Sequence, residues 1–194
     1  MSPYSFTLAT FLVGTIQHFG LSSTVSPTEL PYEDDPKNFE HQHATELLCS
    51  NYTYYMLNRT YTPPVSSECV SVKVTSGLRN GTYQALLKHR FNSSTEISGL
   101  NITVHPFTSG SHTEDNALFF TISNKIMSIY KFMYINSNKT CAVLRATNQQ
   151  NGTGCELFSA EAVAPPSDCT NVYTQYCPNT TYVVWKEDCK RKGN

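Results

Sequence analysis

The sequence predicts an all-β fold, in which eight antiparallel strands close into an up-and-down barrel and a short helix follows near the C-terminus. Three observations lead to this prediction. Short runs of alternating apolar and polar residues recur along the chain, which is the two-residue period of a half-buried strand. The connections between them contain Asn, Gly and Ser, as short turns do. No long helical segment separates consecutive runs, so the strands are expected to pair in sequential order.

Residues 1–23 have the pattern of a secretory signal peptide. An apolar stretch over residues 4–14 precedes small residues over 20–23, among which a signal peptidase could cleave. The stretch is shorter than the roughly 20 apolar residues of a membrane-spanning helix. No Lys or Arg precedes Lys37, so the usual basic start is missing, and an N-terminal core helix is the alternative.

Residues 24–44 are expected to form a flexible acidic arm. This segment contains several prolines and the acidic run Tyr32-Glu33-Asp34-Asp35, and its apolar residues show no helical or strand periodicity. This acidic run, in which Tyr32 could be sulfated, could meet a basic partner, although a solvated segment is the commoner role. A helical turn over residues 44–48 then closes one end of the domain, which spans residues 45–194.

The strands follow in order from residue 53. The clearest alternation lies in residues 69–75, and Asn80-Gly81 after it is the strongest short hairpin signal. A Pro-Pro pair stops the β region before a helix over residues 167–177, and residues 181–185 add an extended piece. The other predicted strands are residues 53–61, 82–91, 100–107, 116–123, 126–135, 139–147 and 155–159.

Glycosylation signals and cysteines indicate a secreted, extracellular protein. An occupied Asn-x-Ser/Thr triplet must lie on the surface of a secretory protein. The seven cysteines include no Cys-x-x-Cys pair of the metal-binding kind, so we expect disulfides with one thiol left over. Eight such triplets occur, at Asn51, Asn58, Asn80, Asn92, Asn101, Asn138, Asn151 and Asn179.

Nucleic-acid binding and catalysis are not favoured. The net charge is −1, which gives no basic surface for nucleic acid. The chain contains no Gly-x-Ser-x-Gly, His-Glu-x-x-His or phosphate-binding glycine loop. His41 and His43 form a His-Gln-His that could touch a metal, but such a pair in a linker is more often solvated. We therefore predict a binding protein without cofactor or metal, rather than an enzyme.

The cysteine-bearing elements resemble those of tick salivary lipocalins, a family that includes histamine-binding and densely glycosylated Japanin-like members. That family carries a Cys-Asp-aliphatic element, a Glu-Leu-Trp element and a following cysteine. The matching segments here contain Ala142 in place of Asp and Phe158 in place of Trp. The resemblance covers about residues 45–189 and implies a lipocalin barrel. It rests on Cys141-Ala142-Val143, Gly154-Cys155-Glu156-Leu157-Phe158, Cys169, Tyr54-Tyr55-Met56, Arg59-Thr60-Tyr61, Cys69-Val70 and Cys189.

The resemblance also implies two disulfides, Cys69 with Cys189 and Cys141 with Cys169. For the remaining cysteines we expect Cys155 to pair with Cys177, although spacing alone does not decide connectivity. Cys49 is then left free, or available for an intermolecular bridge.

Family members that capture histamine or serotonin hold a cation, and a buried cation needs carboxylates. Between Val70 and Gly154 the only carboxylates are Glu96, Glu114 and Asp115, all in expected turns. Glu156 remains from the family's motif, and Arg145 is its candidate ion-pair partner. We therefore favour an apolar ligand such as a fatty acid, eicosanoid or sterol, although the same apolar residues could fill a dry core. The predicted ligand-binding residues are Tyr54, Val72, Val74, Tyr83, Ala85, Leu87, Ile102, Val104, Phe119, Tyr130, Phe132, Glu156 and Phe158.

The role that the resemblance implies is a salivary protein that dampens host inflammatory or immune responses by holding its ligand. Two alternatives stay open. One is a scavenger of biogenic amines, and the other is an immunomodulator that binds a host protein or immune cell.

Overall fold

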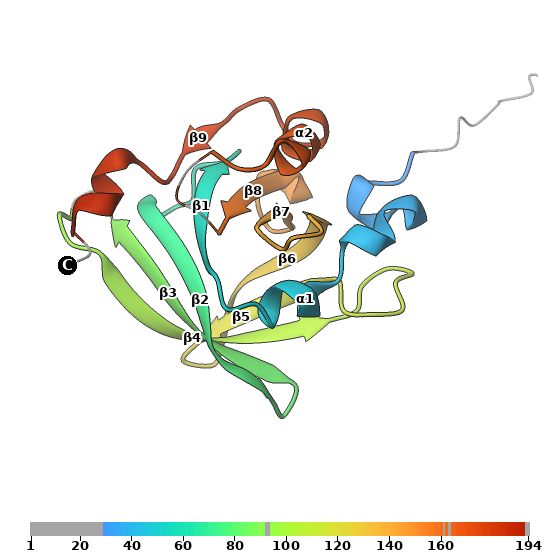
Figure 1. Ribbon diagram of the computed structural model, residues 1–194, viewed down its shortest axis with the longest axis horizontal. Helices are drawn as coiled ribbons and strands as arrows, with labels where there is room; N and C mark the ends of the chain where they lie inside the picture. Colours follow the sequence, from blue (N-terminus) through green and yellow to red (C-terminus); the bar gives the residue numbers. More distant parts are fainter. Residues whose placement is uncertain (1–28, 92–93, 161, 163, 193–194) are drawn as a thin grey trace, which may run out of the picture.

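The computed structural model describes residues 29–91, 94–160, 162 and 164–192, and these form a closed antiparallel barrel (Figure 1). The strand order is β2-β3-β4-β5-β6-β7-β8-β1, and β1 also pairs with β2, which closes the cylinder. The predicted eight-stranded up-and-down barrel is confirmed. Its strands are β1 (Thr53–Arg59), β2 (Ser67–Arg79), β3 (Thr82–Phe91), β4 (Ser98–Phe107), β5 (Ala117–Ile122), β6 (Lys125–Ile135), β7 (Cys141–Ala146) and β8 (Gly154–Ser159).

The largest difference from the predicted strands is in β2, which runs on to Arg79. The hairpin turn explains this extension. Asn80 and Gly81 both have positive φ, 49° and 76°, and a two-residue turn of this kind keeps the flanking strands paired to their ends. Arg79 therefore pairs directly with Thr82.

Among the described residues, the helices α1 and α2 and a short strand accompany the barrel. The predicted helical turn α1 (Ala44–Leu48) buries Leu47 and Leu48 in the barrel. The predicted C-terminal helix α2 (Ser167–Tyr176) packs outside the barrel, against β6, β7 and β8. The extended piece after it contains β9 (Tyr182–Val183), which adds to the edge of β1. No helix in the described ranges is long and apolar enough to cross a membrane.

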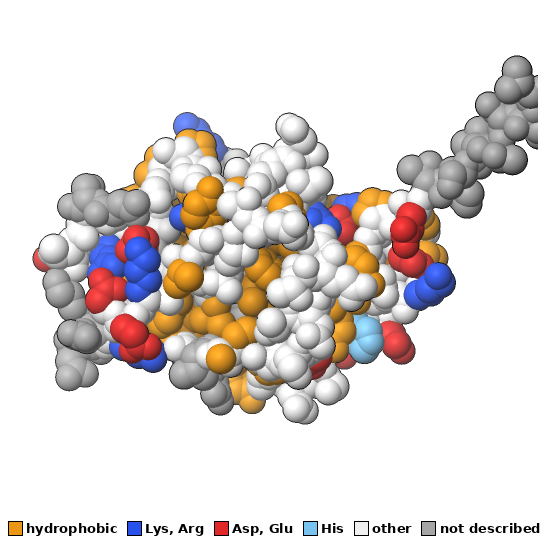
Figure 2. Space-filling view, turned by 90° about the horizontal axis from the view of Figure 1, so that it is seen from above, with side chains coloured by type: hydrophobic (Ala, Val, Ile, Leu, Met, Phe, Trp, Pro, Cys, Tyr) orange, Lys and Arg blue, Asp and Glu red, His pale blue; other side chains and the backbone are white. Residues whose placement is uncertain are grey.

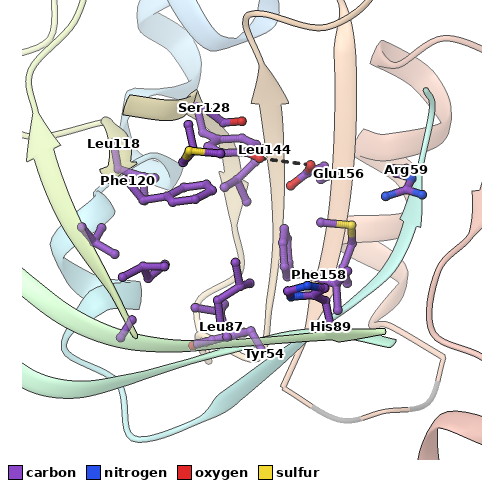
Figure 3. Close-up of a pocket in the computed structure, with 18 of the residues that line it drawn as sticks. Tyr54, Arg59, Leu87, His89, Leu118, Phe120, Ser128, Leu144, Glu156 and Phe158 are labelled. Atoms are coloured by element: carbon purple, nitrogen blue, oxygen red, sulfur yellow. Dashed lines mark hydrogen bonds between the residues drawn. The ribbon is translucent and has the colours of Figure 1, made fainter. Parts of the chain in front are cut away.

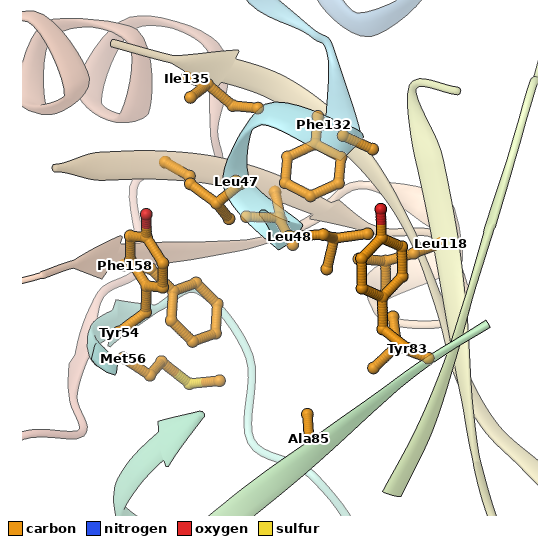
Figure 4. Close-up of a cluster of buried hydrophobic side chains, with 14 of the residues drawn as sticks. Leu47, Leu48, Tyr54, Met56, Tyr83, Ala85, Leu118, Phe132, Ile135 and Phe158 are labelled. Atoms are coloured by element: carbon orange, nitrogen blue, oxygen red, sulfur yellow. The ribbon is translucent and has the colours of Figure 1, made fainter. Parts of the chain in front are cut away.

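The buried hydrophobic residues of the described chain form two clusters. The first fills part of the barrel interior, where Leu47 and Leu48 of α1 meet Tyr54, Phe132 and Phe158 from the strands (Figure 4). The second lies between α2 and the barrel wall, and we call it the outer core. Because β7 and β8 face one cluster on each side, every residue in both strands is buried. The outer core consists of Met133, Cys141, Val143, Cys155, Leu157, Cys169, Tyr173 and Cys177.

The three expected disulfides are present. Cys141–Cys169 and Cys155–Cys177 attach α2 to the neighbouring strands β7 and β8. Cys69–Cys189 ties the C-terminal turn η4 (Glu187–Lys192) to the start of β2 across 120 positions of sequence. Cys49 is free and exposed.

The expectation of a flexible arm is wrong for the residues from Tyr32 onward. They form two short 3-10 turns, η1 (Tyr32–Asp34) and η2 (Pro36–His41), which pack against β6. Glu33 is buried and pairs with Arg145, and Asp34 pairs with Lys131 at 2.8 Å. The basic partner of the acidic run is therefore the barrel itself. Residues 1–28, with the predicted signal peptide and the start of the arm, lie outside the described residues.

Candidate ligand-binding cavity

A cavity of about 380 Å³ lies inside the barrel. This volume is in the range of pockets that hold small molecules, roughly 300–1,000 Å³. All eight barrel strands and α1 contribute side chains to its wall, most of them apolar. Hydrophobic side chains also gather in the middle of the face that Figure 2 shows, with charged side chains at its two ends.

Most of the predicted ligand-binding residues meet at this cavity because they occupy inward-facing positions on paired strands. Eleven of the thirteen lie in its wall: Tyr54, Val72, Val74, Ala85, Leu87, Ile102, Val104, Tyr130, Phe132, Glu156 and Phe158.

Phe119 and Tyr83 lie elsewhere. Phe119 is on the outer face of β5, where its ring stacks on His105 with centroids 4.5 Å apart, and its neighbours Leu118 and Phe120 face the cavity instead. Three consecutive large apolar residues hide the phase of the alternation, which explains the wrong assignment. Tyr83 packs beside Leu118 in the core (Figure 4), with its hydroxyl 3.5 Å from the Cys49 sulfur.

The sequence reasoning also missed polar residues in the wall, chiefly Arg59, Tyr61 and His89. Strict alternation from Tyr54 and Met56 would place Asn58 inside the barrel. The register of β1 against β8 shifts between Met56 and Asn58, so Arg59 faces inward instead. A bulge of this kind inserts one residue, so the side chains after it point to the opposite face of the sheet from the one that strict alternation predicts. The residues around this bulge contain no sequence pattern that indicates it.

Glu156 is the single carboxyl group among the described residues of the cavity wall. It is 2% exposed, and its Oε1 accepts hydrogen bonds from the hydroxyls of Tyr61 and Tyr130. Burial raises the pKa of Glu156 to about 7, against the opposing effects of the two tyrosine hydrogen bonds and of Arg59. At neutral pH this carboxyl is therefore easily protonated.

The expected ion pair between Glu156 and Arg145 is wrong, because the two side chains lie on opposite faces of the wall. Glu156 is in register with Leu144, and both line the cavity. Arg145, one position on, points outward, where its Nε donates to Glu33 Oε1 at 2.8 Å. The alternation of the strand thus sends the arginine to the outer surface of the wall.

Arg59 is the cross-strand neighbour of Glu156, and it is the one arginine among the described residues that line the cavity (Figure 3). Its Nη2 donates to the Ser67 carbonyl oxygen at 3.0 Å, and its carbon Cζ lies 6.0 Å from the centre of the Tyr61 ring. His89 is also buried in the wall, and burial lowers its pKa, so its ring is neutral at pH 7. The cavity wall is thus mostly apolar, with a polar group formed by Arg59, Tyr61, Tyr130 and Glu156, and with His89 as a further polar residue.

Comparisons with known proteins agree with this architecture. The family model described as tick histamine binding protein matches residues 32–191. A sequence search of curated proteins finds no significant match.

Similar solved structures are lipocalins. Apocrustacyanin C2 has a TM-score of 0.57 at 13% identity, over 82% of this chain and 89% of that chain. AM182 has a TM-score of 0.53 at 16% identity, over 81% and 90%. Japanin from Rhipicephalus appendiculatus has a TM-score of 0.52 at 13% identity, over 72% and 96%. At these identities the likeness shows a common fold.

Proposed function

Because this chain belongs to the tick histamine-binding protein family, we propose that it is a secreted binding protein that encloses one small, mainly apolar ligand, such as a fatty acid, eicosanoid or sterol. Holding that ligand would withdraw it from the host and dampen inflammatory or immune responses. The single observation that carries the proposal is the composition of the cavity wall, whose described residues are mostly apolar and include one carboxyl group.

The energetic argument favours an apolar molecule. Burial of apolar surface contributes about 25 cal/mol per Å², so a ligand that contacts the valines, leucines and phenylalanines of the wall gains affinity without any charged partner. Solved relatives in the fold include Japanin bound to cholesterol and a complex of AM182 with serotonin. Both ligand classes are therefore candidates, and the wall must discriminate between them.

A protonated amine would find little compensation in this cavity. The Glu156 carboxyl already accepts hydrogen bonds from Tyr61 and Tyr130, and the positive charge of Arg59 lies at the paired position of the neighbouring strand. A buried cation that lacks a full counter-charge is costly. Amine capture is the second candidate because Glu156 and the tyrosine rings are present, and tyrosine faces can attract a cation.

The test is a ligand screen on the purified, deglycosylated protein. Native mass spectrometry should show a co-purifying lipid, or uptake of an added fatty acid or sterol after delipidation. Histamine and serotonin should bind weakly in calorimetry. Submicromolar amine binding that is lost in Glu156→Gln, and kept in the exposed control Glu96→Gln, would replace the apolar proposal with the amine one.

Secretion and glycosylation belong to the same proposal. Three disulfides fit an oxidising compartment. Seven of the eight sequon asparagines are among the described residues, and none of these seven is buried, so glycans could project into solvent. An immunomodulator that binds a host protein or cell is the remaining alternative. Recovery of a host protein together with a ligand-free cavity would favour it.

A further inference from the structure

Arg59 is a buried cation without a counter-ion among the described residues. It is 7% exposed, and none of the ion pairs in the described part of the chain includes it. Its Nε is fully buried and has no hydrogen-bond partner in the described part of the chain. A buried guanidinium with an unsatisfied donor is expensive, and such groups are normally paired.

The neighbouring carboxyl group does not fill this role. Glu156 is the cross-strand partner of Arg59, yet the ion pairs among the described residues do not join the two side chains. Its Oε1 is turned to the hydroxyls of Tyr61 and Tyr130 instead. Arg90 provides a contrast on the outer side of the wall, because it pairs with both Glu68 and Asp188. Arg59, in contrast to Arg90, lines the cavity and has no ion-pair partner among the described residues.

The position of Arg59 suits the head of an elongated ligand. Arg59 is the last residue of β1 and α1 lies before its first residue, so the guanidinium is at the end of the barrel remote from α1. Leu47 and Leu48 of α1 supply apolar wall at the opposite end. An apolar chain directed toward α1 would thus place its head group at Arg59.

From this arrangement, and resting on the proposed function, we infer that the ligand is an amphiphile with a carboxylate head, and that Arg59 binds this carboxylate. Arginine fits the task because its planar fork of donors matches the two oxygens of a carboxylate. The Nε that lacks a partner would donate to one of these oxygens. Glu156 can accommodate the anion in its protonated form, in which it carries no charge and can itself donate a hydrogen bond.

The inference is tested with three probes that share one chain: dodecanoate, methyl dodecanoate and dodecan-1-ol. Calorimetry on the delipidated wild-type protein should show dodecanoate binding about 10 to 100 times more tightly than the ester, because a charge-assisted hydrogen bond is lost with the carboxylate. This comparison needs no variant, so it does not depend on how a substitution affects folding.

Arg59→Met keeps an apolar stem of similar length and removes the charge. It should lower the affinity for dodecanoate to that for the ester. The affinities for the ester and the alcohol should stay within about twofold of their wild-type values. Arg79→Met, at the exposed hairpin turn, is the matched control and should change none of the three affinities.

Equal binding of acid and ester by the wild type, or unchanged acid binding in Arg59→Met, would overturn the inference and leave the apolar-ligand proposal standing. Failure of all three probes to bind would overturn both.

Discussion

Glu33 and Arg145 form a buried ion pair that joins the segment before the barrel to the outer face of β7. Arg145 Nε lies 2.8 Å from Glu33 Oε1, and both side chains are less than a tenth exposed. Arg145 also donates to the carbonyl oxygens of Thr153 and Tyr176, so one guanidinium connects the N-terminal segment, the turn before β8 and the end of α2. The first prediction concerns this connection.

Replacing Glu33 with Gln should lower the free energy of unfolding by about 3 kcal/mol, because it leaves a buried guanidinium without its counter-ion. Urea denaturation followed by fluorescence would measure the change. Glu40→Gln is the control, since Glu40 is 77% exposed and should change stability by less than about 0.5 kcal/mol. A small effect of Glu33→Gln would mean that the segment is not held by this pair.

The stability of Glu156→Gln relative to wild type should depend on pH. Burial raises the pKa of Glu156 to about 7, above its value in an unfolded chain. Between pH 4.5 and 7 the folded protein therefore retains a proton that the unfolded chain has released, and stability falls as the pH rises through this window. The variant has no titrating group at this position, so it does not lose stability in this way. Its free energy of unfolding, relative to that of wild type, should therefore increase by up to about 3 kcal/mol from pH 5 to pH 8.

Denaturation of both proteins at several pH values would measure this difference. Comparing the two cancels the contribution of His89, whose lowered pKa acts in both. A difference that stays constant across the range would contradict the raised pKa.

Phe120 and Phe119 are adjacent on β5 and should respond differently to truncation. Phe120→Ala removes ring surface from the cavity wall and should weaken binding of an apolar probe by about tenfold, since burying such a side chain is worth about 1.5–3 kcal/mol. Phe119→Ala acts on the outer face and should leave affinity unchanged. Displacement of a fluorescent fatty acid would measure both, and the reverse order would show that the strand phase is wrong.

Removing the Cys69–Cys189 disulfide by a double substitution to Ala should cost about 3–5 kcal/mol, because the bond closes a long loop in the unfolded chain. Cys49→Ser is the matched control for a thiol outside any disulfide, and it should have little effect on stability. Guanidinium denaturation of the oxidised proteins would compare them. Equal stability of the double variant and wild type would show that the tail adds no constraint.

The barrel could be predicted from the sequence because its information is local. Alternation and turn residues lie within a few positions of one another, so residues such as Val72 and Val74 were assigned correctly to the cavity wall. The assignment failed where local pattern is ambiguous or broken, at the apolar run around Phe119 and at the irregular register before Arg59.

The folded N-terminal segment could not be predicted for a different reason. Glu33 and Arg145 are 112 positions apart. A run of acidic residues does not indicate which distant basic residue it pairs with. The same separation explains why the sequence suggests Glu156, which is nearer along the chain, and not Glu33 as the ion-pair partner of Arg145.

The outer core places two of the three cross-links, Cys141–Cys169 and Cys155–Cys177, on the far side of the wall from the cavity. The architecture is thereby secured from outside the chamber. Exchanges of inward-facing residues would then threaten folding less than they would in a domain with a single core. Inward-facing residues could therefore change during evolution to bind a different ligand, while the disulfide-linked outer core stays the same.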